Sequence, residues 1–198
     1  MALDTSELDG RRARRALNRE AVLNALEELW REGNFDASSN DVAERAGLSS
    51  RSLFRYFDDI DDLIRSAIDR SLERFAPLAV VPTTPDRPTD EKVTALCNAL
   101  DRLFSAAGMA AHAARATSHR NPLVAARIEA TRNALRENLA QLFAPELATT
   151  SPGTLDIVSA LTSYEAWELL HRGSKREQAV AREGLEHALN TLLTKEKS

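Results

Sequence analysis

The sequence predicts an all-α protein, with an N-terminal three-helix domain that contains a helix-turn-helix and a C-terminal helical bundle after it. Ala, Leu, Glu and Arg dominate the composition, and the period-two alternation of β-branched residues that marks strands is absent. Prolines gather in residues 76–89 and form an irregular connection. The 198 residues suffice for one large or two small domains, and we divide the chain into residues 1–57 and 58–198.

The first predicted helix runs from about Arg12 to Arg31, after ten residues that we expect to be disordered. Its apolar residues fall on one face, and Gly33 ends it. That face consists of Val22, Ala25, Leu26 and Leu29, with Trp30 beside it.

A capping pattern predicts a short second helix. Ser38 is followed three residues later by Asp41, which is the spacing of a capping box. The helix that begins here ends at Ala46, and Gly47 can adopt the positive φ that a sharp turn needs.

A third helix follows that turn, and a fourth follows directly. Ser49 can cap the third helix, which we expect to run to about Phe57. Four aspartates then open the fourth helix, where negative charge suits the positive end of the helix dipole. They are Asp58, Asp59, Asp61 and Asp62. Apolar residues recur on one face as far as Phe75, so this helix is long enough to link two halves of the molecule.

Longer helices follow the proline-rich connection. Asn121-Pro122 and Ser151-Pro152-Gly153 mark breaks between them, and Ser174 with Glu177 makes a second capping box. The expected helices span residues 90–107, 109–119, 122–144, 154–172 and 175–194.

Composition excludes several classes of protein. No apolar run approaches the length of a membrane span and the N-terminus lacks the apolar stretch of a secretory signal, so we expect a cytoplasmic protein without a membrane partner. Cys97 is the single cysteine, which excludes an intrachain disulfide. The net charge of −4 argues mildly against indiscriminate nucleic-acid binding, yet a groove-binding element needs only a local basic face.

The segment from Ser38 to Leu63 is the most informative part of the chain. A helix-turn-helix needs a small residue where its helices touch, a turn residue tolerant of positive φ, and apolar anchors on either side. Ala43 and Gly47 meet the first two requirements. The anchors are Val42, Leu48 and Leu53.

Burial of these anchors leaves hydroxyl and arginine side chains on the outward side of the third helix. Arg51 and Arg55 lie one helical turn apart without acidic partners. Arginine pairs bidentately with guanine, and serine exchanges hydrogen bonds with base edges. Phe54 and Tyr56 can pack on the sugar–phosphate backbone. The pattern therefore favours an element that reads DNA, with an ordinary helical hairpin and a solvated polar face as the alternative.

Residues from about Arg19 to Leu63 resemble the DNA-binding domain of the TetR family of transcriptional regulators. The resemblance lies in the run DVAERAGLSSRSLFRYF and in apolar and glycine positions before it. These positions are Val22, Leu23, Ala25, Leu29 and Gly33. The resemblance implies an all-helical homodimer that binds a double-stranded DNA operator, with a C-terminal bundle that takes a small-molecule effector.

The resemblance also implies which residues contact DNA. The residues expected to contact bases are Ser50, Arg51 and Ser52 of the third helix. Those expected to contact the DNA backbone and flanking bases are Phe54, Arg55 and Tyr56. Ser38, at the start of the second helix, is expected to hydrogen-bond a phosphate.

Two positions depart from the family's pattern. The lysine that often follows the final Phe by three residues is Ile60 here, so we expect its phosphate contact to be absent. The usual apolar residue early in the second helix is Ser39, so local packing there is expected to differ.

The N-terminal arginines offer a replacement for the missing phosphate contact. Arg12 and Arg14, with Arg11 and Arg15 beside them, form an arm that could reach phosphates or the minor groove. A solvated, disordered tail is the equal alternative.

The C-terminal half suggests a dimer interface and an effector pocket. Residues 154–172 and 175–194 are long, amphipathic and adjacent, and they can pair with their twofold copy as a four-helix interface. Completion of a monomer core is the alternative. Ligand sites combine apolar walls with a few polar groups. The candidates for an effector pocket on this criterion are Phe104, Met109, His112, Arg115, Tyr164, Glu165 and Trp167.

The sequence supports an enzyme less well than it supports a DNA-binding regulator. Glu168 and His171 have the Glu-x-x-His spacing of di-iron bundles, but the second such pair that this chemistry requires is missing. No Ser, Cys or His constellation or glycine-rich phosphate loop indicates catalysis, and we expect no cofactor and no metal. The sequence thus predicts a ligand-responsive transcriptional repressor, with a helical ligand-binding or scaffold protein whose hairpin does not bind DNA as the rival.

Overall fold

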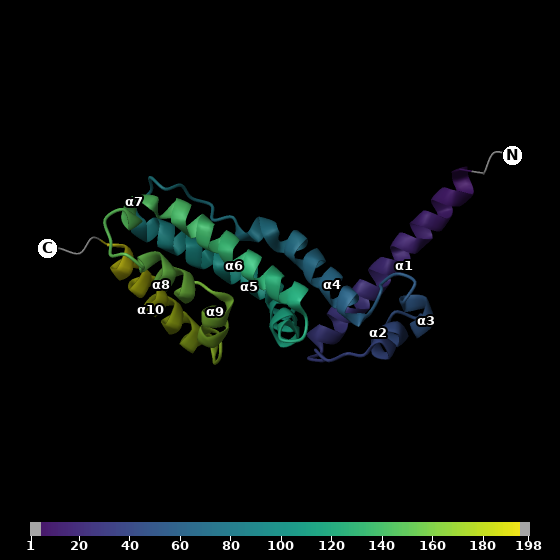
Figure 1. Ribbon diagram of the computed structural model, residues 1–198. Helices are drawn as coiled ribbons and strands as arrows, with labels where there is room; N and C mark the ends of the chain where they lie inside the picture. Colours follow the sequence, from purple (N-terminus) through teal and green to yellow (C-terminus); the bar gives the residue numbers. More distant parts are fainter. Residues whose placement is uncertain (1–4, 195–198) are drawn as a thin grey trace. The chain divides into compact units, whose positions relative to one another are not determined.

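The computed structural model describes residues 5–194, and every element in that range is helical (Figure 1), which confirms the all-α prediction. The elements are α1 (Thr5–Arg31), α2 (Ser39–Arg45), α3 (Ser50–Leu53), α4 (Ile60–Phe75), the 3₁₀ helix η1 (Ala76–Ala79), α5 (Thr89–Ser118), α6 (Pro122–Leu142), α7 (Ala144–Leu147), α8 (Thr154–Leu161), α9 (Tyr164–Leu170) and α10 (Lys175–Leu193). The chain packs as two compact units. The first comprises the chain up to Glu73 with His112–Ala125, and the second comprises Arg74–Ala111 and the chain from Ala126 onward.

One apolar face of α1 forms the centre of the first unit. The predicted face is buried, and Trp30, which we expected beside it, is only 1% exposed. The short helices α2 and α3 add Val42, Ala43 and Leu53 to the same core, all at most 1% exposed. Helix α4 contributes Leu63, Ile64, Ala67 and Ile68.

The N-terminal end of α1 differs from the sequence prediction. Residues 5–10, which we expected to be disordered, form the first turns of this helix. Residues 1–4, covered by the same prediction, lie outside the described part of the chain.

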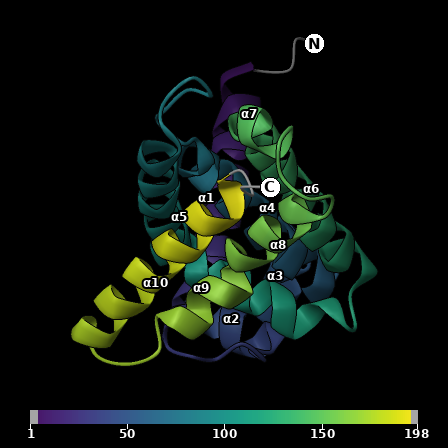
Figure 2. The same ribbon diagram turned by 90° about the vertical axis from the view of Figure 1, so that its left-hand side faces the viewer.

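A second apolar core holds α5, α6, α8, α9 and α10 together. It includes Val93 and Leu96 of α5, Leu139 of α6, Val158 of α8 and Leu189 of α10. Helices α8, α9 and α10 contact one another, and their green-to-yellow ribbons lie together in both views (Figures 1 and 2).

Helix α5 is continuous where the sequence suggested two helices. The expected helices were residues 90–107 and 109–119, but the backbone stays helical through Gly108 between them. The Tyr164 hydroxyl donates a hydrogen bond to the Gly108 carbonyl over 3.1 Å, and the Tyr164 ring lies 3.9 Å from where a Cβ would stand. A Cβ at this distance would make an ordinary van der Waals contact with the ring. The hydrogen bond from Tyr164 therefore tethers α9 to α5 at a residue of poor helix propensity.

The predicted helix 154–172 is instead two helices with a break between them. Thr162 ends α8, and Ser163 caps α9 by accepting a hydrogen bond from the Ala166 N–H over 3.2 Å. Serine with an acidic residue in the following turn is a helix-start signal, so the sequence held evidence for this break.

A buried ion pair fastens the connection after α4 to the second unit. The Lys92 ammonium is fully buried and donates to Glu146 and to the carbonyls of Pro85 and Leu142. Burial alone would raise the pKa of Glu146, but hydrogen bonds from Lys92 and Thr89 hold this pKa below its ordinary value. The pair links α5, α7 and the proline-rich loop at one point.

We expect Lys92→Met to destabilise the protein by about 3 kcal/mol, because Glu146, whose side chain is 11% exposed, would be left without its counter-ion. Urea unfolding followed by circular dichroism measures the loss. Lys92→Met combined with Glu146→Leu should recover most of it, since both charges are then absent. Arg87→Ala, which breaks an exposed pair with Glu91, should cost no more than about 1 kcal/mol. A loss at Lys92 no larger than this control would contradict the assignment.

Candidate DNA-contacting surface

Helix α2 begins with a complete capping box. The Ser38 hydroxyl accepts from the Asp41 N–H over 3.3 Å, and Asp41 Oδ2 accepts from both the Ser38 N–H and the Ser38 hydroxyl. These hydrogen bonds lower the pKa of Asp41 from its ordinary value. The hydroxyl that we expected to bond a phosphate therefore already has a partner, and it would have to exchange that partner on binding DNA.

The turn between α2 and α3 has the predicted geometry. Gly47 has a φ of 68°, in the left-handed region that favours glycine, and Ala43 at the helix contact is 1% exposed. The Leu48 N–H donates to the Ala43 carbonyl over 2.9 Å. Leu48 itself is half-buried rather than fully enclosed.

Helix α3 is shorter than predicted. Ser49 caps it as expected, by accepting from the Ser52 N–H over 3.2 Å, but the α-helix ends at Leu53 and not at Phe57. The next residues continue as hydrogen-bonded turns, and Phe57 turns inward to 2% exposure. The Arg19 guanidinium lies 4.9 Å from the centre of the Phe57 ring, a cation–π contact that holds this end of the segment against α1.

The arginines of this segment remain available. The side chains of Arg51 and Arg55 are exposed, and among the described residues neither forms an ion pair. Phe54 is 46% exposed beside them. Two guanidinium groups and an aromatic ring therefore face solvent on one short stretch, a combination suited to phosphates and base edges.

The serines of α3 are oriented by neighbouring side chains. The Ser50 hydroxyl donates to Asn40 Oδ1, and the Ser52 hydroxyl lies 2.9 Å from that of Ser49. Both serines are half-buried. Asn40 did not figure in the sequence prediction, and no local sequence signal links it to Ser50.

Tyr56 is held from α1. Its hydroxyl accepts a hydrogen bond from Asn18 Nδ2 over 2.8 Å, which leaves its own proton free to be donated. Arg15 donates to the Arg55 carbonyl over 3.4 Å. These contacts join residues about forty positions apart, so the sequence prediction missed Asn18.

The predicted arginine arm is part of a helix. Arg12, Arg14 and Arg15 are exposed along α1. The side chain of Arg11 lies outside the described part of the structure. A helical scaffold fixes the spacing of these charges, which agrees with the predicted start of the first helix at about Arg12.

Two of the acidic residues after α3 accept hydrogen bonds from backbone N–H groups at the start of α4. The Asp58 N–H donates to Asp62 Oδ2 over 3.1 Å, and the Asp62 N–H donates to Asp59 Oδ1 over 2.7 Å. Asp62 also pairs with Arg65. Their charges serve the helix terminus, as the sequence suggested.

The predicted effector residues fall into separate places. Phe104, Tyr164 and Trp167 form an aromatic cluster in the second unit, with ring centres 5.6–6.0 Å apart. Met109 is 38% exposed, and His112 belongs to the first unit, where its ring lies 4.4 Å from that of Phe35. Arg115 is also in the first unit, and Glu165 pairs with Arg132 on the surface.

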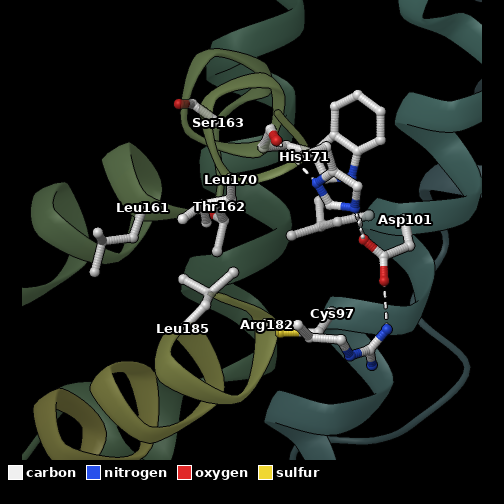
Figure 3. Close-up of a pocket in the computed structure, with 11 residues that line it drawn as sticks. Cys97, Asp101, Leu161, Thr162, Ser163, Leu170, His171, Arg182 and Leu185 are labelled. Atoms are coloured by element: carbon white, nitrogen blue, oxygen red, sulfur yellow. Dashed lines mark hydrogen bonds and ion pairs between the residues drawn. The ribbon is translucent and has the colours of Figure 1, made fainter. Parts of the chain in front are cut away.

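A polar junction centred on Asp101 borders this aromatic cluster (Figure 3). The Asp101 carboxylate accepts from Trp167 Nε1 over 3.1 Å and pairs with Arg182, and His171 Nε2 lies 3.3 Å from it. The cavity at this junction has a volume of about 20 Å³, enough for about one water molecule. Burial raises the pKa of the adjacent Cys97 thiol to about 12, so this thiol stays protonated at neutral pH.

Glu168 and His171, which have the Glu-x-x-His spacing, both interact with other side chains or backbone groups. His171 Nδ1 bonds the Trp167 carbonyl and its other nitrogen faces Asp101, while Glu168 lies 3.7 Å from Arg172. Among the described residues no group of three or more His, Cys, Asp or Glu side chains is placed to hold a metal ion.

A larger cavity in the second unit escaped the sequence prediction. It has a volume of about 270 Å³ and lies between α5, α6 and the segment from Ala79 to Pro85. Leu100 and Thr162 border both cavities. The periodic leucines of α5 and α6 looked like ordinary core positions, so no signal in the sequence distinguished them.

A comparison with models of protein families agrees with this geometry. Residues 22–67 match the sequence profile of the bacterial regulatory proteins of the tetR family. No curated protein is significantly similar in sequence to the chain.

Several solved structures share the fold. A tetR-family transcriptional regulator from Streptomyces coelicolor superimposes with a TM-score of 0.67 at 20% identity, over 89% of this chain and 80% of that one. A transcriptional regulator from Rhodococcus sp. Rha1 gives 0.67 at 19% identity, over 88% and 95%. The multidrug binding protein EbrR, solved with imidazole, gives 0.63 at 21% identity, over 91% and 96%.

The fold and the surface together define a class, the helix-turn-helix proteins that carry a C-terminal helical bundle. Within this class the chain has the TetR-type fold of transcriptional regulators, and the resemblance expected from its sequence is confirmed. Within the described residues no helix is long and apolar enough to cross a membrane.

Proposed function

We propose that this protein is a ligand-responsive transcriptional repressor that binds a palindromic operator as a homodimer in the cytoplasm. The observation that carries the proposal is the pair of exposed guanidinium groups, Arg51 and Arg55, on a TetR-type helix-turn-helix. Selection of bound sequences from random duplex DNA, followed by a gel shift, tests it. Recovery of no preferred sequence would favour the rival, a ligand-binding or scaffold protein.

In the proposed complex α3 enters the major groove. Ser50, Arg51 and Ser52 read base edges, while Phe54, Arg55 and Tyr56 contact backbone and flanking bases. Ser38 contributes a phosphate contact by exchanging its bond to Asp41. The two half-sites lie about one helical turn, roughly 34 Å, apart or somewhat further.

The proposed homodimer forms through the last helices, α8 to α10. Ile157 on α8 is 52% exposed and Val180 on α10 is 63% exposed. Gly184 lies inside α10, and a Cβ added there would meet nothing within 4 Å of its own chain. A glycine inside a helix lowers stability by roughly 0.5–1 kcal/mol relative to alanine. In the proposed dimer its missing side chain would allow a partner helix to approach closely.

The effector acts in the second unit in this proposal. Of the predicted ligand contacts, Phe104, Met109, Tyr164 and Trp167 lie in this unit and stay a prediction, whereas His112 belongs to the first unit. Helix α4 leads from the helix-turn-helix to the second unit, so a ligand that favours one dimer geometry over another changes the separation of the two DNA-contacting surfaces. We propose no catalytic activity and no cofactor.

Arg51→Ala should weaken binding to the selected operator by about 1–3 kcal/mol and relax the preference at one base pair. Fluorescence anisotropy with the operator and its single-base variants measures both effects. Arg102→Ala, at an exposed arginine of α5, is the control and should change neither. An Arg51→Ala protein with intact sequence preference would refute the assigned base-reading role.

Arg12→Gln with Arg14→Gln should flatten the salt dependence of operator binding, because each lost phosphate contact lowers the slope of log K against log[salt] by about 0.9. The substitutions keep the helix and remove only charge, and Arg31→Gln, at the other end of α1, serves as the control. An unchanged slope would show that this part of α1 does not contact the phosphates.

Ile157→Glu with Val180→Glu should convert the homodimer into monomers, because the charges would be buried at an apolar contact. Sedimentation velocity at micromolar concentration detects the change. Leu17→Glu is the matched control, since Leu17 is 70% exposed on α1, and it should leave the dimer intact. A wild-type monomer under these conditions would overturn the proposed interface.

A further inference from the structure

Apolar side chains of α5 and α6 form most of the walls of the larger cavity in the second unit. Helix α5 presents Leu96, Ala99, Leu100 and Leu103 to it at helical spacing. Helix α6 presents a matching row that includes Leu135, Leu139 and Leu142. Ala99, which is 2% exposed, lines the cavity with only a methyl group, whereas its neighbours on this face carry isobutyl groups.

The polar groups of this cavity are few and neutral. Asn138 and Gln141 lie on α6 at exposed positions of the lining, and Thr83 belongs to the loop opposite. The Thr162 hydroxyl is satisfied by the Val158 carbonyl over 2.8 Å. None of the described residues that line the cavity is charged. A charged group placed between the apolar walls would lose its hydration without gaining a counter-ion, which is unfavourable.

The third wall of the cavity is the segment from Ala79 to Pro85, which lies shortly after α4 in the chain. Only η1 separates α4 from Val80 and Val81, and Val80 is 67% exposed at the cavity. The far end of the loop is fastened by the Lys92 ammonium through the Pro85 carbonyl. The loop segment 80–83 therefore lies between a fixed point and the helix that leads to the DNA-contacting surface.

We propose that this cavity binds a small neutral apolar molecule that carries one or two hydrogen-bonding groups, and that the aromatic cluster near Asp101 is not the principal ligand site. The apolar body of the ligand lies between the leucines of α5 and α6, and its polar group faces the amides of Asn138 and Gln141. The proposal names the ligand class for the effector site and rests on the proposed function only in treating this ligand as the effector.

The test compares two dyes that share one skeleton. N-phenyl-1-naphthylamine is neutral and carries a single N–H donor, and 8-anilinonaphthalene-1-sulfonate is the same molecule with an added anionic group. Fluorescence titration of the full chain should give saturable binding of one neutral dye per chain. The sulfonate should bind at least about tenfold more weakly, because no cation lies in the cavity.

Cavity-filling variants locate the bound dye. Ala99→Leu should weaken binding of the neutral dye at least about tenfold by occupying its volume, and Leu135→Phe should weaken it from the opposite wall. Ala106→Leu places the same substitution at an exposed position of α5 and should leave the affinity unchanged. Circular dichroism shows which variants fold, and two variants on different helices keep the test decisive if one of them does not.

Equal affinity for the two dyes, or equal affinity of folded Ala99→Leu and Ala106→Leu, would overturn the proposal. The titration contains no DNA, so its outcome is independent of the gel shift. A protein that binds the neutral dye as described but selects no DNA sequence would retain this site and lose the proposed regulatory function.

Discussion

The two short helices of the candidate DNA-contacting surface, α2 and α3, depend on the apolar core that they share with α1. Helix α2 has seven residues and α3 has four, and isolated helices of this length are not stable in water. Helix α2 packs on α1 and α3 packs on α2, with Val42, Ala43 and Leu53 buried, and a serine caps the start of each short helix. Without that core, no rigid arrangement of the surrounding polar side chains would exist.

Local chemistry made part of this structure predictable. Ser38 with Asp41, Gly47 and Ser49 act within a few residues, and each produced the cap or turn that its type favours. The same holds for Ser174 with Glu177 at the start of α10. Such signals need no knowledge of the rest of the chain.

The sequence predicted helix boundaries incorrectly where residues far apart in the chain contact one another. Phe57, which was expected to end α3, is instead buried against Arg19. Helix α5 continues through Gly108, whose carbonyl accepts a hydrogen bond from Tyr164, fifty-six residues later. The orientation of Tyr56 by Asn18 is of the same kind. The larger cavity escaped prediction because a void is a property of packed volumes, and Ala99 reads in the sequence like any small core residue.

The brevity of α3 has a consequence for how occupancy of an operator would depend on protein concentration. In the proposed complex a single copy would offer a small contact area, so its affinity for one half-site would be modest. Two linked copies make the second contact intramolecular, at an effective concentration set by their separation. Where the proposed dimer is in equilibrium with monomers, occupancy rises with roughly the square of the amount of protein, so a modest drop in expression could release an operator without any ligand.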